Sequence, residues 1–246
     1  MFESALLLVA VASGAIAAVT GFGIGSLLTP FLALHAGTKI AVAAVSVPHL
    51  IGTALRFWRL RAGVDRGVLW HFGVMSAAGG LGGALLHTSV ASPALTIVFG
   101  ALLVFAGASH VTGFARRWQF HGGVAWVAGA ASGFFGGLVG NQGGIRSAAM
   151  LGFGLQKEAF VATATAIALL VDGARMPVYV AVEWREVAAI WTLVLIATTG
   201  VVAGTLAGAR LLSRVPERVF RQVVGMTILL LGLVTLAGPL TAGTHP

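Results

Sequence analysis

Long stretches without a charged residue constrain this chain more than any other feature. Asp, Glu, Lys and Arg are absent from residues 4–38, 67–115, 118–145, 187–209 and 223–246. A helix needs about 20 mostly apolar residues to cross a bilayer, so the second stretch alone has room for two crossings. A soluble core is the alternative, but with 9% charged residues too few polar side chains remain to coat a globule. We therefore expect an all-α integral membrane protein.

Glycines, prolines and polar clusters divide the apolar sequence into about eight expected transmembrane helices. The first segment, residues 3–20, breaks at a glycine cluster and resumes to about residue 34, so one or both pieces are candidates for half-helices around a broken backbone. No basic residue precedes this segment, so we expect a retained helix and no cleaved signal peptide. The other helices are expected at residues 39–58, 67–87, 93–113, 123–139, 157–182, 185–212 and 216–238.

The net charge of +8 indicates lipid contact here, although in a soluble protein it would suggest nucleic acid. Basic residues lie near expected helix ends beside Trp58, Trp70, Trp118 and Trp184. This pattern is typical of anchoring at anionic headgroups, so membrane lipid is an expected partner and nucleic acid is not. Eight simple crossings would divide the basic residues almost evenly between the two sides, so the sequence leaves the orientation open.

An internal duplication is indicated by a shift of 119 positions, which aligns a series of residues in order. The matched pairs are Gly21 with Gly140, Gly25 with Gly144, Arg56 with Arg175, and Arg66 with Arg185. We expect a first transmembrane repeat at 1–115, a linker at 116–121, a second repeat at 122–240 and a disordered tail at 241–246. Four crossings per half would make the repeats parallel, whereas an extra partial crossing at each glycine break would invert them.

The most enclosed polar cluster of the chain lies between two apolar runs, and a weaker copy occurs near the start. The cluster contains Gly140, Asn141, Gln142, Gly143, Gly144 and Arg146, and the copy contains Gly21, Gly23 and Gly25. Successive glycines let adjacent N–H groups converge on an anion, and a guanidinium adds a planar fork for a sulfonate or carboxylate. We expect both copies to meet within the membrane as an anion site. Alternatively, the glycines serve helix packing and the arginine snorkels to the interface.

Few other charged groups are placed at membrane depth. Asp172 lies three residues before Arg175, so both share a helical face and can pair. Arg175 is a further substrate-binding candidate. Asp172 is a coupling candidate that either relays a proton or only neutralises Arg175, and we favour the structural pair. His49, beside a proline, is the second coupling candidate, and a packing role is its alternative. Arg56, which matches Arg175, is either a functional residue or, as we favour, a lipid-facing anchor near a helix end.

The sequence also lacks the usual signatures of enzymes. The acids are scattered, no phosphate-binding lysine follows a glycine loop, and the histidines have no metal-site spacing. The chain has no cysteine, which excludes disulfides and thiolate chemistry. We therefore expect no catalytic residue, no cofactor and no metal.

These motifs resemble those of the TauE/SafE sulfite-exporter family of bacterial membrane transporters. In that family each half carries a G-x-G-G-G stretch followed by a proline. The first copy here is followed by Pro30, whereas Ala149 stands where the second proline is usual. The resemblance implies secondary transport of a small anion such as sulfite, sulfoacetate or another organosulfonate, by alternating access, in the bacterial inner membrane. Coupling to H⁺ or Na⁺ and a homodimer stay open, and a passive anion channel or a non-transporting membrane subunit are the alternatives.

Overall fold

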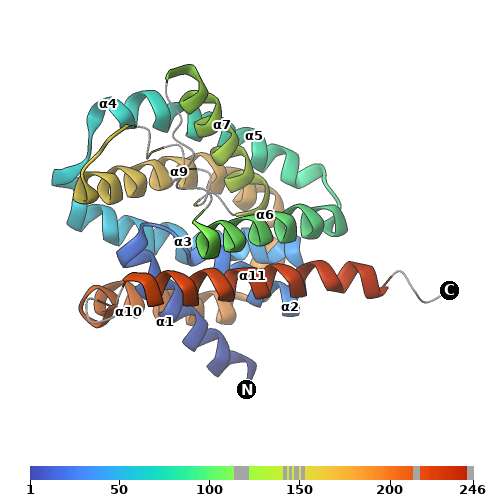
Figure 1. Ribbon diagram of the computed structural model, residues 1–246. Helices are drawn as coiled ribbons and strands as arrows, with labels where there is room; N and C mark the ends of the chain where they lie inside the picture. Colours follow the sequence, from blue (N-terminus) through green and yellow to red (C-terminus); the bar gives the residue numbers. More distant parts are fainter. Residues whose placement is uncertain are drawn as a thin grey trace.

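The computed structural model describes residues 1–113, 122–140, 143, 146, 150, 153–212 and 217–242. These residues form helices and connecting turns and contain no strand (Figure 1), which confirms the all-α prediction. Within them, seven helices are long and apolar enough to cross a membrane, and two apolar stretches are shorter, Ile24–Ala36 and Gly225–Ala237. The number of long helices therefore differs slightly from the predicted eight.

The described helices fall into two halves along the chain. In the first half they are α1 (Phe2–Thr20), α2 (Ile24–Ala36), α3 (Thr38–Leu60), the short turns η1 (Arg61–Gly63), α4 (Arg66–Val68) and η2 (Leu69–Gly73), α5 (Val74–Ser89) and α6 (Ser92–Thr112). In the second half they are α7 (Gly122–Val139), α9 (Lys157–Ala189), α10 (Trp191–Leu212) and α11 (Glu217–Ala242). The predicted helix end near residue 182 is wrong, because the charged residues that suggested a loop continue α9 to Ala189.

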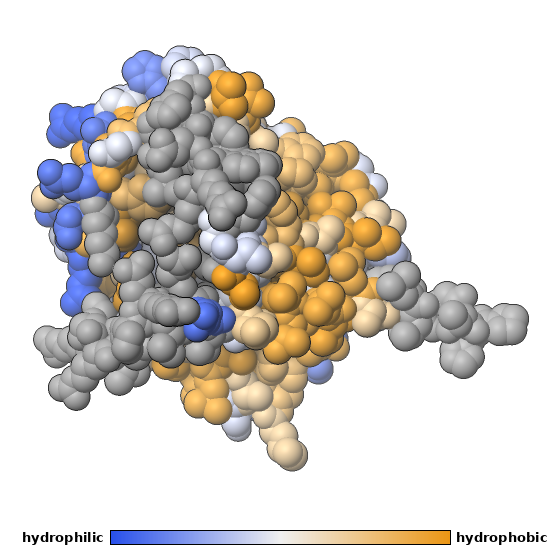
Figure 2. All heavy atoms as spheres, in the orientation of Figure 1, coloured by the Kyte–Doolittle hydropathy of each residue, from blue (hydrophilic) through white to orange (hydrophobic). Residues whose placement is uncertain are grey.

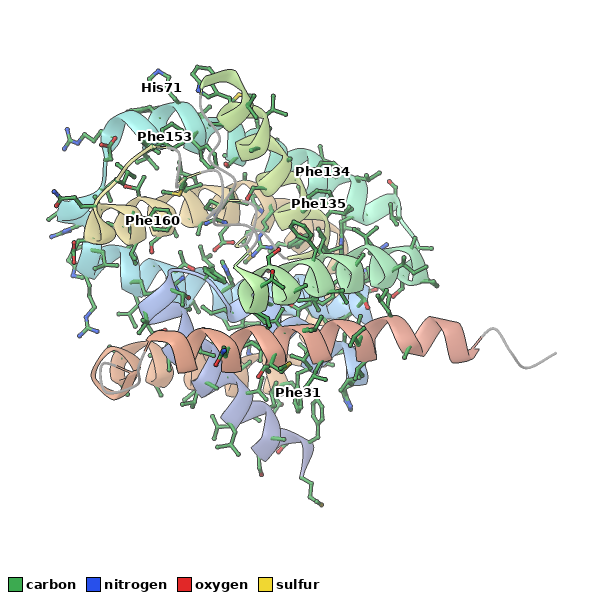
Figure 3. All side chains as sticks on the ribbon, in the orientation of Figure 1. Phe31, His71, Phe134, Phe135, Phe153 and Phe160 are labelled. Atoms are coloured by element: carbon green, nitrogen blue, oxygen red, sulfur yellow. The ribbon has the colours of Figure 1, made fainter. Side chains whose placement is uncertain are left out.

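The first glycine cluster reverses the chain. The ring of Phe2, at the start of α1, stacks on Phe31 at 5.2 Å and on His35 at 4.8 Å, near the end of α2 (Figure 3). The turn between the helices contains Gly21 (φ 82°) and Gly23 (φ 126°), backbone angles that favour glycine. Both glycines are buried, so α1 and α2 form a helical hairpin whose turn lies inside the bundle.

A second reversal occurs in the other half. Trp126, near the start of α7, lies 5.4 Å from the ring of His71, and Phe153 lies 5.9 Å from the ring of Phe72. His71 and Phe153 are labelled at the same end of the molecule in Figure 3. The chain therefore enters along α7 and returns to the same end before α9 begins.

The helix pairing is symmetric on exchange of the two halves. The first helix of each half packs along a later helix of the other, α1 on α10 and α7 on α5, while α3 packs on α9 and α6 on α11. Glycines allow the close approach in both of the first pairs: a Cβ at Gly204 would meet the carbonyl oxygen of Val11, and one at Gly137 that of Gly80. This packing supports the predicted duplication, although the boundary at 116–121 stays a prediction.

The corresponding helices run in opposite directions. In α3 and α9, His49 contacts Asp172, whereas the earlier residue Ser46 contacts the later Met176. Helices α6 and α11 lie alongside each other (Figure 1), and they too are antiparallel, since Gly100 packs on Leu236 and Gly107 on Leu229. A two-fold axis that exchanges antiparallel helices lies perpendicular to them. The structure therefore favours inverted repeats over parallel ones.

Candidate anion-binding site

The two glycine motifs touch each other. Gly25 packs so closely on the carbonyl oxygen of Gly140 that a Cβ there would collide with it. Gly143 packs on Phe22, because a Cβ at Gly143 would lie 2.6 Å from that of Phe22. Gly140 has a φ of 73°, similar to the value at the Gly21 turn. The motifs thus meet in the interior, while Asn141, Gln142 and Gly144 lie outside the described residues.

Two arginines hold the inner ends of α1 and α7 in matching ways. Arg56 Nη1 donates to the carbonyl oxygen of Ala17 at 2.5 Å, and Arg175 Nη1 donates to that of Gly136 at 2.7 Å. Both donor and acceptor match under the shift of 119 positions. Each carbonyl also accepts, at 3.0 Å, the N–H of the turn glycine of its half, Gly21 or Gly140. The duplication seen in the sequence therefore extends to individual hydrogen bonds.

Asp172 satisfies the positive charge of Arg175. Its Oδ1 accepts from Arg175 Nη2 at 2.7 Å and from Nε at 3.0 Å, and its Oδ2 lies 2.7 Å from His49 Nδ1. All three side chains are buried. The structure thus contains the expected pair three residues apart, and it joins both coupling candidates in one cluster, a contact between α3 and α9 that the sequence did not predict.

Among the described residues, no carboxylate forms an ion pair with Arg56. Its Nη2 donates to Thr53 Oγ1 at 3.1 Å, and its Nε has no hydrogen-bond partner. The side chain is only 3% exposed. The prediction that Arg56 is a lipid-facing anchor is therefore wrong: although it lies one turn before the end of α3, its helical face turns toward α1.

Arg146 lies beside the first glycine turn. Its Nη1 donates to the carbonyl oxygen of Ala164 at 2.9 Å, and its Nε has no partner. The methyl group of Ala164 lies 3.9 Å from where a Cβ of Gly21 would be. Arg146 is 3% exposed, so it does not snorkel to the surface, and it lies within electrostatic range of Asp172 as well as of Arg56 and Arg175.

The charges of this cluster do not balance. Three buried guanidinium groups, those of Arg56, Arg146 and Arg175, face the one carboxylate of Asp172 in the described part of the site, an excess of two positive charges if His49 is neutral. A buried charge without a partner is costly. The hydroxyl of Thr29, 3.7 Å from where a Cβ of Gly140 would be, is also buried without a partner. A bound anion would compensate this excess.

The sequence signals for these residues differ in strength. Arg56 matches the buried Arg175 in the duplication, and that match is a sequence signal for its burial. Thr29 carries no signal beyond its place before Pro30. Tyr179, whose hydroxyl donates to the carbonyl oxygen of Gly137, lies one turn after Arg175 on α9 and was not singled out. Groups of three or more metal-ligating side chains are absent among the described residues.

These features define a class of protein: a multi-pass helical membrane protein in which two inverted halves, each with a glycine turn, surround a buried cationic site. The chain belongs to the TauE/SafE family, because the family model described as "Sulfite exporter TauE/SafE" matches residues 6–235, nearly its whole length. This confirms the predicted family, which is a family of membrane transporters. Neither a curated protein nor a solved structure matches the chain.

Proposed function

We propose that the protein is a secondary transporter of a small sulfur-containing anion, such as sulfite, sulfoacetate or another organosulfonate. The observation that carries this proposal is the excess of buried guanidinium groups, two of which keep an unpaired Nε. A guanidinium fork binds an oxyanion through two parallel hydrogen bonds to two of its oxygens, whether the anion is a carboxylate or a tetrahedral group. The substrate-binding role of the glycine motifs and of Arg146 and Arg175 is part of this proposal.

The helix ends support the same site. Helix α2 begins at Ile24 inside the bundle, and its N-cap residue Gly23 provides no side-chain cap. The first turn of a helix carries unsatisfied N–H groups and a partial positive charge, which favour an anion. We propose that the two inverted halves rock around this site and expose it to each side in turn.

We propose that transport is coupled to an ion gradient. The proposed coupling ion is H⁺, and Na⁺ is the alternative. His49 contacts the carboxylate of Asp172, which in turn holds Arg175. Histidine can change charge within the physiological pH range. A proton arriving at His49 would therefore alter the balance of charge within the site. We therefore propose His49 and Asp172 as the residues that couple proton movement to transport.

The distribution of basic residues suggests how the protein sits in the membrane. Seven described positions lie at the end that holds α4: Arg59, Arg61, Arg66, Lys157, Arg210, Arg218 and Arg221. Lys39 and Arg185 lie at the opposite end. The hydrophilic residues at the left of Figure 2 belong to the α4 end. Among the described residues, the basic positions near the helix ends therefore divide unevenly between the two ends. By the positive-inside rule we propose that this end is cytoplasmic, in the bacterial inner membrane.

The experiment measures sulfite uptake into proteoliposomes for the wild type, for Arg146→Gln and for the control Arg59→Gln. Arg59 is exposed at the end of α3, so its loss removes a charge outside the site. We expect saturable uptake by the wild type and the control, and none by Arg146→Gln. Uptake at the wild-type rate by folded Arg146→Gln would contradict the proposal, and non-saturating currents would indicate a channel instead.

A further inference from the structure

We infer that the transported anion binds Arg56 at the position that corresponds to the Asp172 carboxylate beside Arg175, so that Asp172 is a tethered copy of the substrate's charged group. The inference rests on the proposed function and specifies the site within it. It adds Arg56 to the residues of the proposed site, because the Nε and Nη2 donors of Arg175 are already taken by Asp172.

The two arginines share one hydrogen bond and differ in the others. Both use Nη1 to bind the equivalent carbonyl at the inner end of α1 or α7. The Nε and Nη2 of Arg175 both donate to Asp172, at 3.0 and 2.7 Å. In Arg56, Nε has no hydrogen-bond partner, and Nη2 donates to the Thr53 hydroxyl. The Nε and Nη2 donors bind a carboxylate in the second half, whereas in the first half they contact no negative charge of the described residues.

The residue before each arginine explains this difference. Thr53 and Asp172 are equivalent under the shift of 119 positions, and each lies three residues before its arginine on one helical face. Thr53 is fully buried, so solvent does not replace the missing carboxylate. A threonine hydroxyl can donate as well as accept, so it could turn to donate to a bound anion.

The surroundings define the class of anion. The Nε of Arg146, also without a partner, belongs to a side chain beside the same glycine turn. In the second half one oxygen of Asp172, Oδ1, accepts from both Nε and Nη2 of Arg175, and the other oxygen faces His49. An anion at Arg56 would likewise use one oxygen for Nε and Nη2, and it needs a second oxygen on the same centre to face Arg146. Sulfite, a sulfonate or a carboxylate meets this requirement. Chloride offers a single acceptor centre and does not.

The test replaces Thr53 by a carboxylate or by a neutral side chain of the same shape. In Thr53→Asp the new carboxylate would pair with Arg56 as Asp172 pairs with Arg175, whereas Thr53→Asn brings no charge. Without added anion, we expect Thr53→Asp to melt at a higher temperature than Thr53→Asn. A melting temperature equal to or below that of Thr53→Asn would overturn the inference, because the site would then not favour a carboxylate.

The second arm adds sulfite, with chloride at equal ionic strength as the control. Sulfite should raise the melting temperature of the wild type and of Thr53→Asn, but not that of Thr53→Asp, whose own carboxylate fills the site. An equal rise in both variants would overturn the inference. If sulfite does not change the melting temperature of the wild type while Thr53→Asp still melts above Thr53→Asn, sulfite is excluded as the ligand. The inferred anion position beside Arg56 is then still supported.

Discussion

Removal of the internal carboxylate gives the sharpest prediction about stability. Asp172 is fully buried and bonds both Arg175 and His49. Truncation of one partner of a buried ion pair typically costs about 3–5 kcal/mol, because the other charge is left without compensation. We expect Asp172→Ala to lose that much stability, and to leave a space beside Arg175 of the size of a small carboxylate.

Formate should therefore restore part of the loss. A ligand that binds only the folded state at about 100 times its dissociation constant adds roughly 2.7 kcal/mol. The assay is unfolding of the detergent-solubilised protein at increasing formate concentrations, with chloride as the salt control. The stability of Asp172→Ala should rise more steeply than that of the wild type, because only the variant has an empty position beside Arg175. An Asp172→Ala protein as stable as the wild type, or one indifferent to formate, would refute the reasoning.

Two further predictions concern the motif contact and the coupling. Gly25→Ala should cost about 1–3 kcal/mol and abolish sulfite uptake, because the new methyl group meets a backbone carbonyl; Gly82→Ala, which meets no neighbour within 4 Å, is the matched control and should gain up to about 1 kcal/mol. Equal stability and uptake in the two variants would argue against the contact. His49→Gln should still bind sulfite but lose acceleration of uptake by an imposed pH gradient, and a wild-type response to the gradient would exclude His49 from coupling.

Local patterns in the sequence were enough for the helical class, the glycine break and the Asp172–Arg175 pair. Charge-free length dictates membrane helices, and a spacing of three residues dictates a shared helical face. The direction of the chain after Gly21 was not accessible, because a glycine turn can either kink a helix or reverse it. The contact of Phe2 with the end of α2 decides between these, and that contact is a matter of tertiary packing.

Residues near helix ends were the hardest to place. Arg56 lies four residues before the end of α3, where an outward face would anchor lipid and an inward face enters the site. Ser46, His49, Thr53 and Arg56 recur at helical spacing and share one face of α3, and this pattern was the available signal that Arg56 faces inward. The partnership of His49 with Asp172 joins two helices of different halves, and only the antiparallel packing of α3 on α9 brings them together.

The central claim is that surplus buried guanidinium groups bind one anion, and calorimetric titration of sulfite into the purified protein measures this directly. We predict one site per chain in the wild type and in Arg59→Gln, and no measurable binding in the double variant Arg56→Gln/Arg146→Gln, with folding checked by circular dichroism. Sulfite binding by the folded double variant with unchanged affinity would contradict the account.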